Sequence, residues 1–197
     1  MMTEQRHSDY PIEPIFMNRW SPRAYDASSM PMVDLLTILE AARWAPSAFN
    51  VQPWRFLYAQ RGDAHWGSYL NLLDPGNAAW AQYASALLFL ISDTLMPGDE
   101  GSSDKLSTYH SFDTGAAWAQ LALQATSLGY QAHAMAGIHF DCVREHLGVP
   151  KRYRIEIAIA IGKRAAPEML PEELQAREQL SQRYSVSEIA FSGVFPQ

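Results

Sequence analysis

The stretch "ARWAPSAFNVQPWRF", Ala42–Phe56, joins a helical pattern to a strand pattern through two prolines. Apolar residues before it recur at helical spacing, and Pro46 ends that helix because the residue before a proline is pushed out of the helical region. After Pro53, the aromatic run "WRFLYAQ" indicates a strand. The small and polar residues between the prolines favour either a sharp turn with core anchors or a backbone surface that holds a ligand.

Outward from this junction, helical and strand patterns alternate along the chain. Helices are predicted over residues 14–20, 31–45, 63–73, 107–128 and 141–148, and strands over residues 54–60, 85–92, 130–136 and 153–162. Between them lie a predicted turn at 74–77, "DPGN", and a flexible-looking insertion at 94–107. In the last strand, strict alternation places Ile155, Ile157, Ile159 and Ile161 on one face. This order predicts an α+β fold with helices on both sides of a small sheet.

The 197 residues fit a single domain, 1–197, with a loose N-terminal arm at 1–13 and an extended tail at 165–197. The proline- and charge-rich tail has little core of its own, which indicates that it wraps around another surface, such as a second subunit. A net charge of −6 argues against nucleic acid as a partner. The longest apolar run is too short to span a membrane, and the N-terminus has no apolar signal core. A single cysteine, Cys142, favours a reducing compartment, so we expect a cytoplasmic protein.

Known catalytic motifs are absent from the sequence. It contains no P-loop, GxGxxG, HExxH, CxxC or nucleophile elbow, and its six histidines lack a convincing metal spacing, so we expect no metal site. Asp113, in the predicted long helix, is interpreted either as facing a cavity or as a carboxylate near the helix N-terminus. If the protein is an enzyme, a bound cofactor therefore carries its chemistry.

Three segments suit an anionic cofactor, and each has an alternative interpretation. In "RWSPR", Arg19 and Arg23 flank a serine and suit a phosphate, or they are surface charge. The opening stretch offers backbone amides and the Asn50 and Gln52 side chains to a planar heterocycle, or it is a plain turn. Near the tail, "QLSQRYS" adds Arg183 as a further cation, which alone is a weak signal.

The order "RWSPRAY", "APSAFNVQPWRF", "GYQAHAMAGIHFD" and "LPEEL…RE…R" resembles the FMN-dependent nitroreductase family over about residues 16–195. The "PSxxNxQPW" core with an upstream "RxSxR" is the specific part. The resemblance implies a nitroreductase-like α+β fold with a small central, mainly antiparallel sheet flanked by helices. It also implies an intertwined homodimer with exchanged C-terminal tails and two FMN molecules at the interface.

The resemblance also implies site residues. Arg19, Trp20 (through its backbone), Ser21 and Arg23 match positions that hold the FMN phosphate and ribityl chain, with Arg183 as a C-terminal phosphate cation and Lys163 and Arg164 as competing candidates. Pro46, Ser47, Ala48 and Asn50 match a loop that reaches the flavin from the partner subunit. Asn77 matches a contact to the isoalloxazine edge, and Ala136 and Gly137 match the backbone beside flavin N5. Tyr109, His110 and Phe112 are predicted at the mouth of the substrate pocket, or as a helix start packed on the dimer. The chain departs from many relatives at Ala136, where they have glutamate or glycine, and in "GIHFD", which is longer than the usual "GFD" or "GWD".

The implied activity is an FMN-dependent NAD(P)H oxidoreductase with a ping-pong cycle and a small-molecule acceptor such as a nitroaromatic or quinone. Such a reaction needs a backbone N–H at flavin N5 and a donor near the reduced ring, but no side-chain acid or base. The missing catalytic motif agrees with this. Two alternatives stay open. One is a specialised flavin enzyme of the same fold, namely a dehalogenase, an enoate reductase or an oxidase. The other is a flavin-binding protein without turnover.

Overall fold

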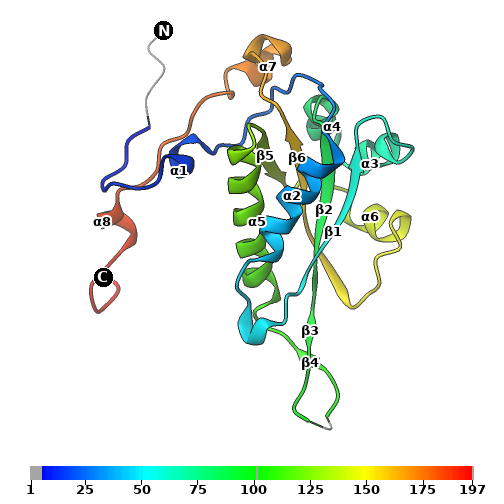
Figure 1. The fold of residues 1–197 in the computed structure, drawn as a ribbon, viewed down its shortest axis with the longest axis vertical. Coiled ribbons are helices and arrows are strands. Elements are labelled where there is room, and N and C mark those ends of the chain that lie inside the picture. The colour runs from blue at the N-terminus through cyan, green and yellow to red at the C-terminus, as the bar shows by residue number, and fades with distance from the viewer. Residues whose placement is uncertain (1–5, 101, 197) are drawn as a thin grey trace.

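The computed structural model describes residues 6–100 and 102–196 of the chain. Its centre is a four-stranded sheet in the order β1-β2-β6-β5, in which every neighbouring pair is antiparallel (Figure 1). The strands are β1 (Trp54–Gln60), β2 (Ala86–Asp93), β5 (Gln131–Met135) and β6 (Tyr153–Gly162). The predicted α+β class and the mainly antiparallel sheet are confirmed.

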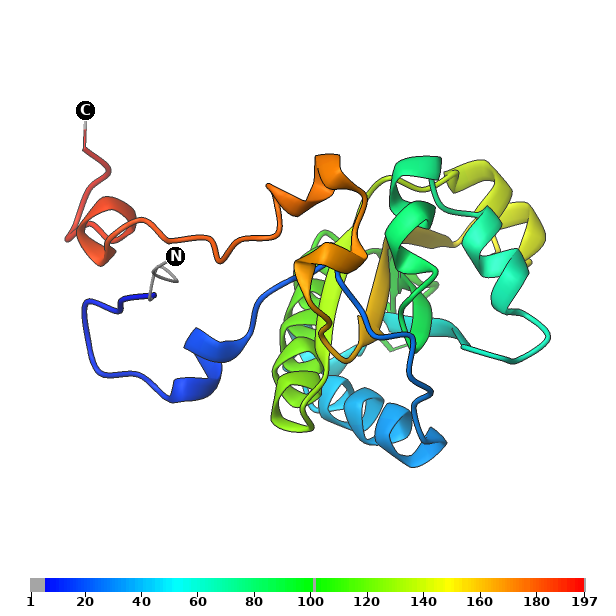
Figure 2. The same ribbon diagram turned by 90° about the horizontal axis from the view of Figure 1, so that it is seen from above.

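One face of the sheet is covered by α2 (Met32–Arg43) and α5 (His110–Ser127), as Figure 2 shows from above. Leu35 and Ile38 of α2 are fully buried in one core cluster with Leu121 of α5 and with Leu88 of β2. Alanines on the inner face of α5 let the two helices approach the sheet closely, as the small-residue pattern of this segment indicates.

The other face is covered by three short helices, α3 (Trp66–Asn71), α4 (Pro75–Ala81) and α6 (Phe140–His146). Their core contains Trp80, Phe89 and Val143, each at most 1% exposed. Strand β2 is buried along its whole length because helices cover both of its faces, which explains its continuous apolar run.

Several local predictions are wrong. The register of β2 and β6 shifts between Leu90 and Ile91, so Ile155 belongs to the core cluster of α3, α4 and α6, whereas Ile159 and Ile161 lie in the cluster of α2 and α5. The predicted turn at 74–77 is the beginning of α4, whose first residue is a proline because that position needs no N–H donor.

The beginning of α5 and the insertion at 94–107 also differ from the prediction. The long helix begins at His110, not at residue 107. The insertion contains a short antiparallel ladder, β3 (Leu95–Met96) with β4 (Lys105–Leu106). Arg152 anchors its base with ion pairs to Asp93 and Asp104 at 2.6 and 3.1 Å.

Of the predicted N-terminal arm, residues 1–5 lie outside the described residues. Residues 6–13 and the C-terminal tail up to residue 196 leave the body together and run side by side (Figures 1 and 2). The arm leads into α1 (Pro14–Asn18), and the tail contains η2 (Pro167–Met169), α7 (Glu172–Gln175) and α8 (Val186–Ile189). The Val186 N–H donates to Asp9 Oδ2 at 2.6 Å and joins the two segments. Large apolar side chains stay exposed on both: Tyr10, Ile12, Phe16, Tyr184, Val186, Ile189, Phe191, Val194 and Phe195. In the described parts of the chain, every helix is too short or too polar to cross a lipid bilayer.

Candidate functional site

The segment Arg19–Ala24, here called the arginine loop, connects α1 to the body of the protein. Two side chains of the edge strand β5 hold its backbone. Gln131 Oε1 accepts the Trp20 N–H at 3.2 Å, and the ring of His133 bonds the Pro22 carbonyl through Nδ1 at 2.9 Å. The loop is thus fixed without using its own polar side chains.

The ring of His133 is a neutral donor in this arrangement. It packs against Trp80 with ring centroids 4.7 Å apart, and burial lowers its pKa to about 4, assisted by the nearby Arg23 cation. Because a backbone carbonyl only accepts, the Nδ1–H must donate to Pro22. Near neutral pH, His133 therefore anchors the loop without adding charge.

Glu178 holds the loop from the opposite side. This buried carboxylate of the tail accepts the Arg23 N–H at 2.8 Å and the Ala24 N–H at 2.9 Å. Sequence reasoning missed this role, although Glu178 lies in the "RE" pair of the tail motif. A glutamate in a polar, charge-rich tail carries no local signal for a partner 155 residues away.

A groove of about 430 Å³ lies beside the loop and contains Arg19 and Ser21 on its wall. The Arg19 Nη1 donates to Ser21 Oγ at 3.4 Å. The other lining residues are Phe16 of α1, Trp118, Ala119, Ala122 and Leu123 of α5, and Ala134 of β5. A cation and a hydroxyl at the edge of an otherwise apolar groove suit a ligand with an anionic end and a flat apolar body.

Arg19 and Arg183 lie close enough to repel each other. Burial lowers the pKa of Arg19, and the Arg183 cation lowers it further. Arg23 behaves similarly: burial and then Arg177 lower its pKa, against the opposing effect of Glu178. Among residues 6–100 and 102–196, no carboxylate forms an ion pair with Arg19, Arg23 or Arg183. Uncompensated cations of this kind are typical of an anion site.

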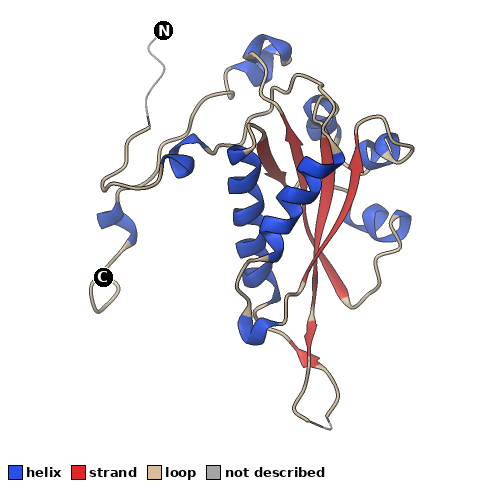
Figure 3. Ribbon diagram, in the orientation of Figure 1, coloured by secondary structure: helices blue, strands red, loops and turns tan. Residues whose placement is uncertain are grey.

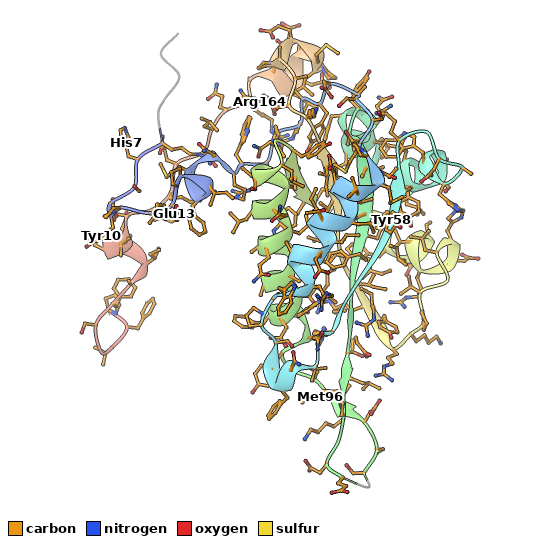
Figure 4. All side chains as sticks on the ribbon, viewed as in Figure 1. His7, Tyr10, Glu13, Tyr58, Met96 and Arg164 are labelled. Carbon is orange, nitrogen blue, oxygen red and sulfur yellow. The ribbon has the colours of Figure 1, made fainter. Side chains whose placement is uncertain are left out.

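The two other candidate cations have aromatic neighbours. The Arg164 guanidinium stacks over Trp20 at 4.9 Å, and the Lys163 ammonium lies 5.7 Å from the ring centroid of Tyr130. In Figure 4, Arg164 lies at the end of the sheet where the chain leaves β6 and enters the tail. Which of these cations contacts a phosphate stays a prediction.

Residues 46–52, here called the shelf, have an unusual backbone. Phe49, Asn50 and Gln52 all have φ between 52° and 54°, the left-handed region that non-glycine residues rarely adopt. The short helix η1 (Ala48–Asn50) carries two of them, and the Phe49 ring is 84% exposed. Such strain persists only where surrounding contacts enforce it, and it is common at functional sites.

Two side chains hold the shelf in this backbone conformation. Ser47 Oγ accepts the Gln52 N–H at 3.0 Å, and Asp113 Oδ2 accepts the Ala48 N–H at 3.0 Å. Asp113 lies in the first turn of α5 and is 5% exposed. Of the two interpretations of Asp113, the structure bears out the carboxylate near the helix N-terminus, and this carboxylate binds the shelf backbone.

Asn77 and Gly137, expected at one end of the ligand, are brought into direct contact. Asn77 Nδ2 donates to the Gly137 carbonyl at 2.9 Å, and the Asp74 N–H donates to the same oxygen at 3.0 Å. A Cβ on Gly137 would lie 2.5 Å from Asn77 Nδ2, so any other residue here would displace the Asn77 side chain. Ala136 beside it is exposed at the end of β5.

The predicted pocket-mouth residues lie at the start of α5. Tyr109 and Phe112 are 50% and 81% exposed. His110 instead points into a polar network, with Nδ1 2.8 Å from Ser92 Oγ, and that hydroxyl donates to Glu156 Oε1 at 2.6 Å. A role of these three residues at a pocket mouth stays a prediction.

The shelf and the arginine loop lie at different places along α5. Asp113 holds the shelf at the first turn, whereas the α5 residues that line the groove beside Arg19 run from Trp118 to Leu123, which is about 8–15 Å further along the helix. Figure 3 shows the same arrangement, with the shelf at the starting end of α5 and α1 beside its upper half. One chain therefore presents two separate candidate half-sites, the arginine loop and the shelf.

Comparison with known proteins agrees with the fold. The sequence model of the nitroreductase family matches residues 16–83 and 67–163. A crystal structure of an oxidoreductase containing FMN superposes with a TM-score of 0.94, at 48% identity over 100% of this chain and 99% of that one.

Two curated relatives are also similar to this chain. An uncharacterised 15.4 kDa protein of Mycolicibacterium smegmatis is 33% identical over 149 residues, which is 71% of this chain and 95% of that protein. The CLA biosynthesis enone reductase of Lactiplantibacillus plantarum is 28% identical over 184 residues, covering 77% of this chain and 84% of that protein.

Proposed function

The chain belongs to the nitroreductase family of oxidoreductases, and on that premise we propose that it is an FMN-dependent NAD(P)H oxidoreductase with a small-molecule acceptor. The observation that carries the proposal is the group of uncompensated arginines beside an apolar groove. The FMN content of the structural relative at 48% identity supports the same cofactor here.

The residues present fit FMN. Arg19, Ser21 and Arg23, with Arg183, would hold the phosphate, because guanidinium groups bind phosphate oxygens in pairs. Trp20 would contribute backbone to the ribityl chain. At the other end, Asn77 and the Ala136–Gly137 backbone would face the ring, and the contact between Asn77 and Gly137 supports this grouping.

We propose that the complete site needs two chains. Pro46, Ser47, Ala48 and Asn50 of the shelf would cover the flavin bound to the arginine loop of a partner, and the tails would be exchanged. The separation of the two half-sites along α5 supports this arrangement, as do the exposed apolar side chains of the arm and the tail. The exposed Phe49 ring would become buried in such a dimer.

The chemistry that bound FMN supplies is hydride transfer from NADH or NADPH to an acceptor, in the two half-reactions of a ping-pong cycle. The protein's part is to bind and orient. The arginines would fix the phosphate end, the shelf would exclude water from one face, and backbone groups at Ala136 and Gly137 would align the reacting edge. We assign no side chain as acid or base, and we place the reaction in the cytoplasm, as the single cysteine favours.

A second candidate is an enone reductase, the specialised flavin enzyme that the Lactiplantibacillus plantarum relative favours. The two candidates share the reduction by NAD(P)H and differ only in the acceptor. Turnover with a nitroaromatic or a quinone therefore indicates the first candidate, and turnover with an α,β-unsaturated ketone indicates the second.

The test is anaerobic reduction of the purified protein. We expect it to be yellow, to lose flavin absorbance within seconds of adding NADH or NADPH, and to regain it with at least one acceptor class. A yellow protein that neither nucleotide bleaches is a flavin-binding protein without turnover. A colourless protein that does not quench FMN fluorescence refutes the proposal.

A further inference from the structure

Arg6, in the N-terminal arm, reaches back to the arginine loop. Its Nη1 donates to the Arg19 carbonyl at 2.6 Å and to the Met17 carbonyl at 2.9 Å. Its Nε is buried and has no hydrogen-bond partner among residues 6–100 and 102–196. A buried donor without an acceptor costs free energy unless a ligand supplies the acceptor.

The tail meets Arg6 at a small hollow of about 50 Å³. Its lining combines Arg6, His7, Phe16 and Met17 of the arm and α1 with Ser181, Gln182 and Arg183 of the tail. Arg183 Nη1 donates only within its own segment, to Ser181 Oγ at 2.9 Å and to the Gln182 carbonyl at 2.8 Å. The hydrogen bond between Asp9 and Val186 keeps arm and tail together just beyond this point.

Arg6 and Arg183 line this hollow, and Arg19 lines the neighbouring groove, with Phe16 common to both. Burial lowers the pKa of Arg6, and the Arg183 and Arg19 cations lower it further. Within the described residues, no carboxylate forms an ion pair with Arg6. An anion placed among the three would offset their repulsion and supply acceptors for their free N–H groups.

We propose that Arg6 is a further cation of the FMN phosphate site, and that the N-terminal arm and the C-terminal tail close together over the bound phosphate group. The inference rests on the proposed function, because it takes FMN as the ligand. It adds a residue from outside the motifs that carry the resemblance. It also gives the arm a role: Arg6 ties the arm to the loop backbone and places positive charge opposite Arg183.

The first test compares Arg6→Gln with Lys151→Gln, which removes an exposed cation outside the cluster. Flavin fluorescence quenching gives the dissociation constants of FMN and of riboflavin, which lacks the phosphate. We expect Arg6→Gln to weaken FMN binding about tenfold and to leave riboflavin binding unchanged, since one charge-assisted contact is lost. Lys151→Gln should leave both constants unchanged. An unchanged ratio of the two constants in Arg6→Gln overturns the inference.

The second test is limited trypsin digestion of the wild-type protein, because Arg6 and Arg183 are themselves cleavage sites. We expect saturating FMN to slow cleavage after both arginines together, and saturating riboflavin to leave both rates unchanged. Equal protection by the two flavins, or protection of one site alone, contradicts joint closure over the phosphate. If the wild type binds neither flavin, the proposed function fails and this inference with it. If it binds FMN and Arg6→Gln binds FMN equally well, only this inference fails.

Discussion

The arginine loop and the shelf differ in how the rest of the protein holds them and in which groups they leave exposed. Other elements hold the loop by its backbone, through Gln131, His133 and Glu178, so its arginine side chains stay available. The shelf is held in a strained left-handed backbone by the buried carboxylate of Asp113, with the exposed Phe49 ring at its tip. One region thus offers charge and the other offers backbone shape. Substitutions in the loop should therefore weaken the binding of FMN more than that of riboflavin, which lacks the phosphate. Substitutions in the shelf should weaken the binding of both flavins equally.

The largest expected effect comes from Arg19→Ala combined with Arg23→Ala. Loss of two charge-assisted contacts should weaken FMN binding about 100-fold or more, because each is worth about 1.5–3 kcal/mol. Riboflavin binding should change little. Fluorescence titration with both flavins measures this difference, and circular dichroism checks that the fold is intact. The control is Arg43→Gln combined with Lys151→Gln, which changes the net charge by the same amount at positions away from the loop. Unchanged FMN retention would refute the phosphate-site assignment.

Glu178→Ala should break the support of the loop without removing an arginine. Two buried backbone N–H groups lose a charged acceptor, so the free energy of unfolding should fall by about 2–3 kcal/mol. Urea denaturation measures the loss, and Glu173→Ala, at an exposed position of the same tail, should show none. FMN binding should weaken more than riboflavin binding. A variant as stable as the wild type would show that the contact contributes nothing.

Asp113→Ala should loosen the shelf, because the Ala48 N–H loses its acceptor. We expect a destabilisation of about 1–2 kcal/mol and weaker flavin binding, equal for FMN and riboflavin. Asp113→Asn keeps one acceptor oxygen and should show a smaller effect. A loss confined to FMN would contradict the division of roles between the two regions.

The smallest effect concerns pH and His133. Its pKa is about 4 in the folded protein and about 6.5 when unfolded, so the unfolded state binds more protons between these values. Stability should therefore fall as pH decreases through this window, by about 1 kcal/mol between pH 7 and pH 5.5. Urea denaturation at both pH values measures it. His133→Asn keeps a side-chain N–H for Pro22 and should remove this contribution. An equal pH dependence in the variant would assign it to other groups.

Local patterns in the sequence predicted the elements well and their long-range partners poorly. The alternation and aromatic runs located the four strands of the central sheet. The "RxSxR" and "PSxxNxQPW" motifs pointed to the arginine loop and the shelf, whose roles at a flavin stay predictions. The side of the sheet that Ile155 faces depends on a register shift between β6 and β2, where β6 carries an extra residue that no local period encodes. The supporting contacts of Glu178 and Asp113 join residues far apart in the chain, so their partners emerged only from the folded structure. Arg6 lies outside every motif and has no signal of its own.

The central claim is that one flavin needs the arginine loop of one chain and the shelf of another. Its most direct test is a mixed dimer, made by co-expressing Arg19→Ala/Arg23→Ala and Asp113→Ala chains with different tags and purifying through both. Each parent should lose FMN at low flavin concentration. In a symmetric dimer the mixed species has one intact site, so it should bind about half the FMN per chain that the wild type binds. A mixed dimer that binds no more FMN than its parents would contradict the claim and place each site within a single chain.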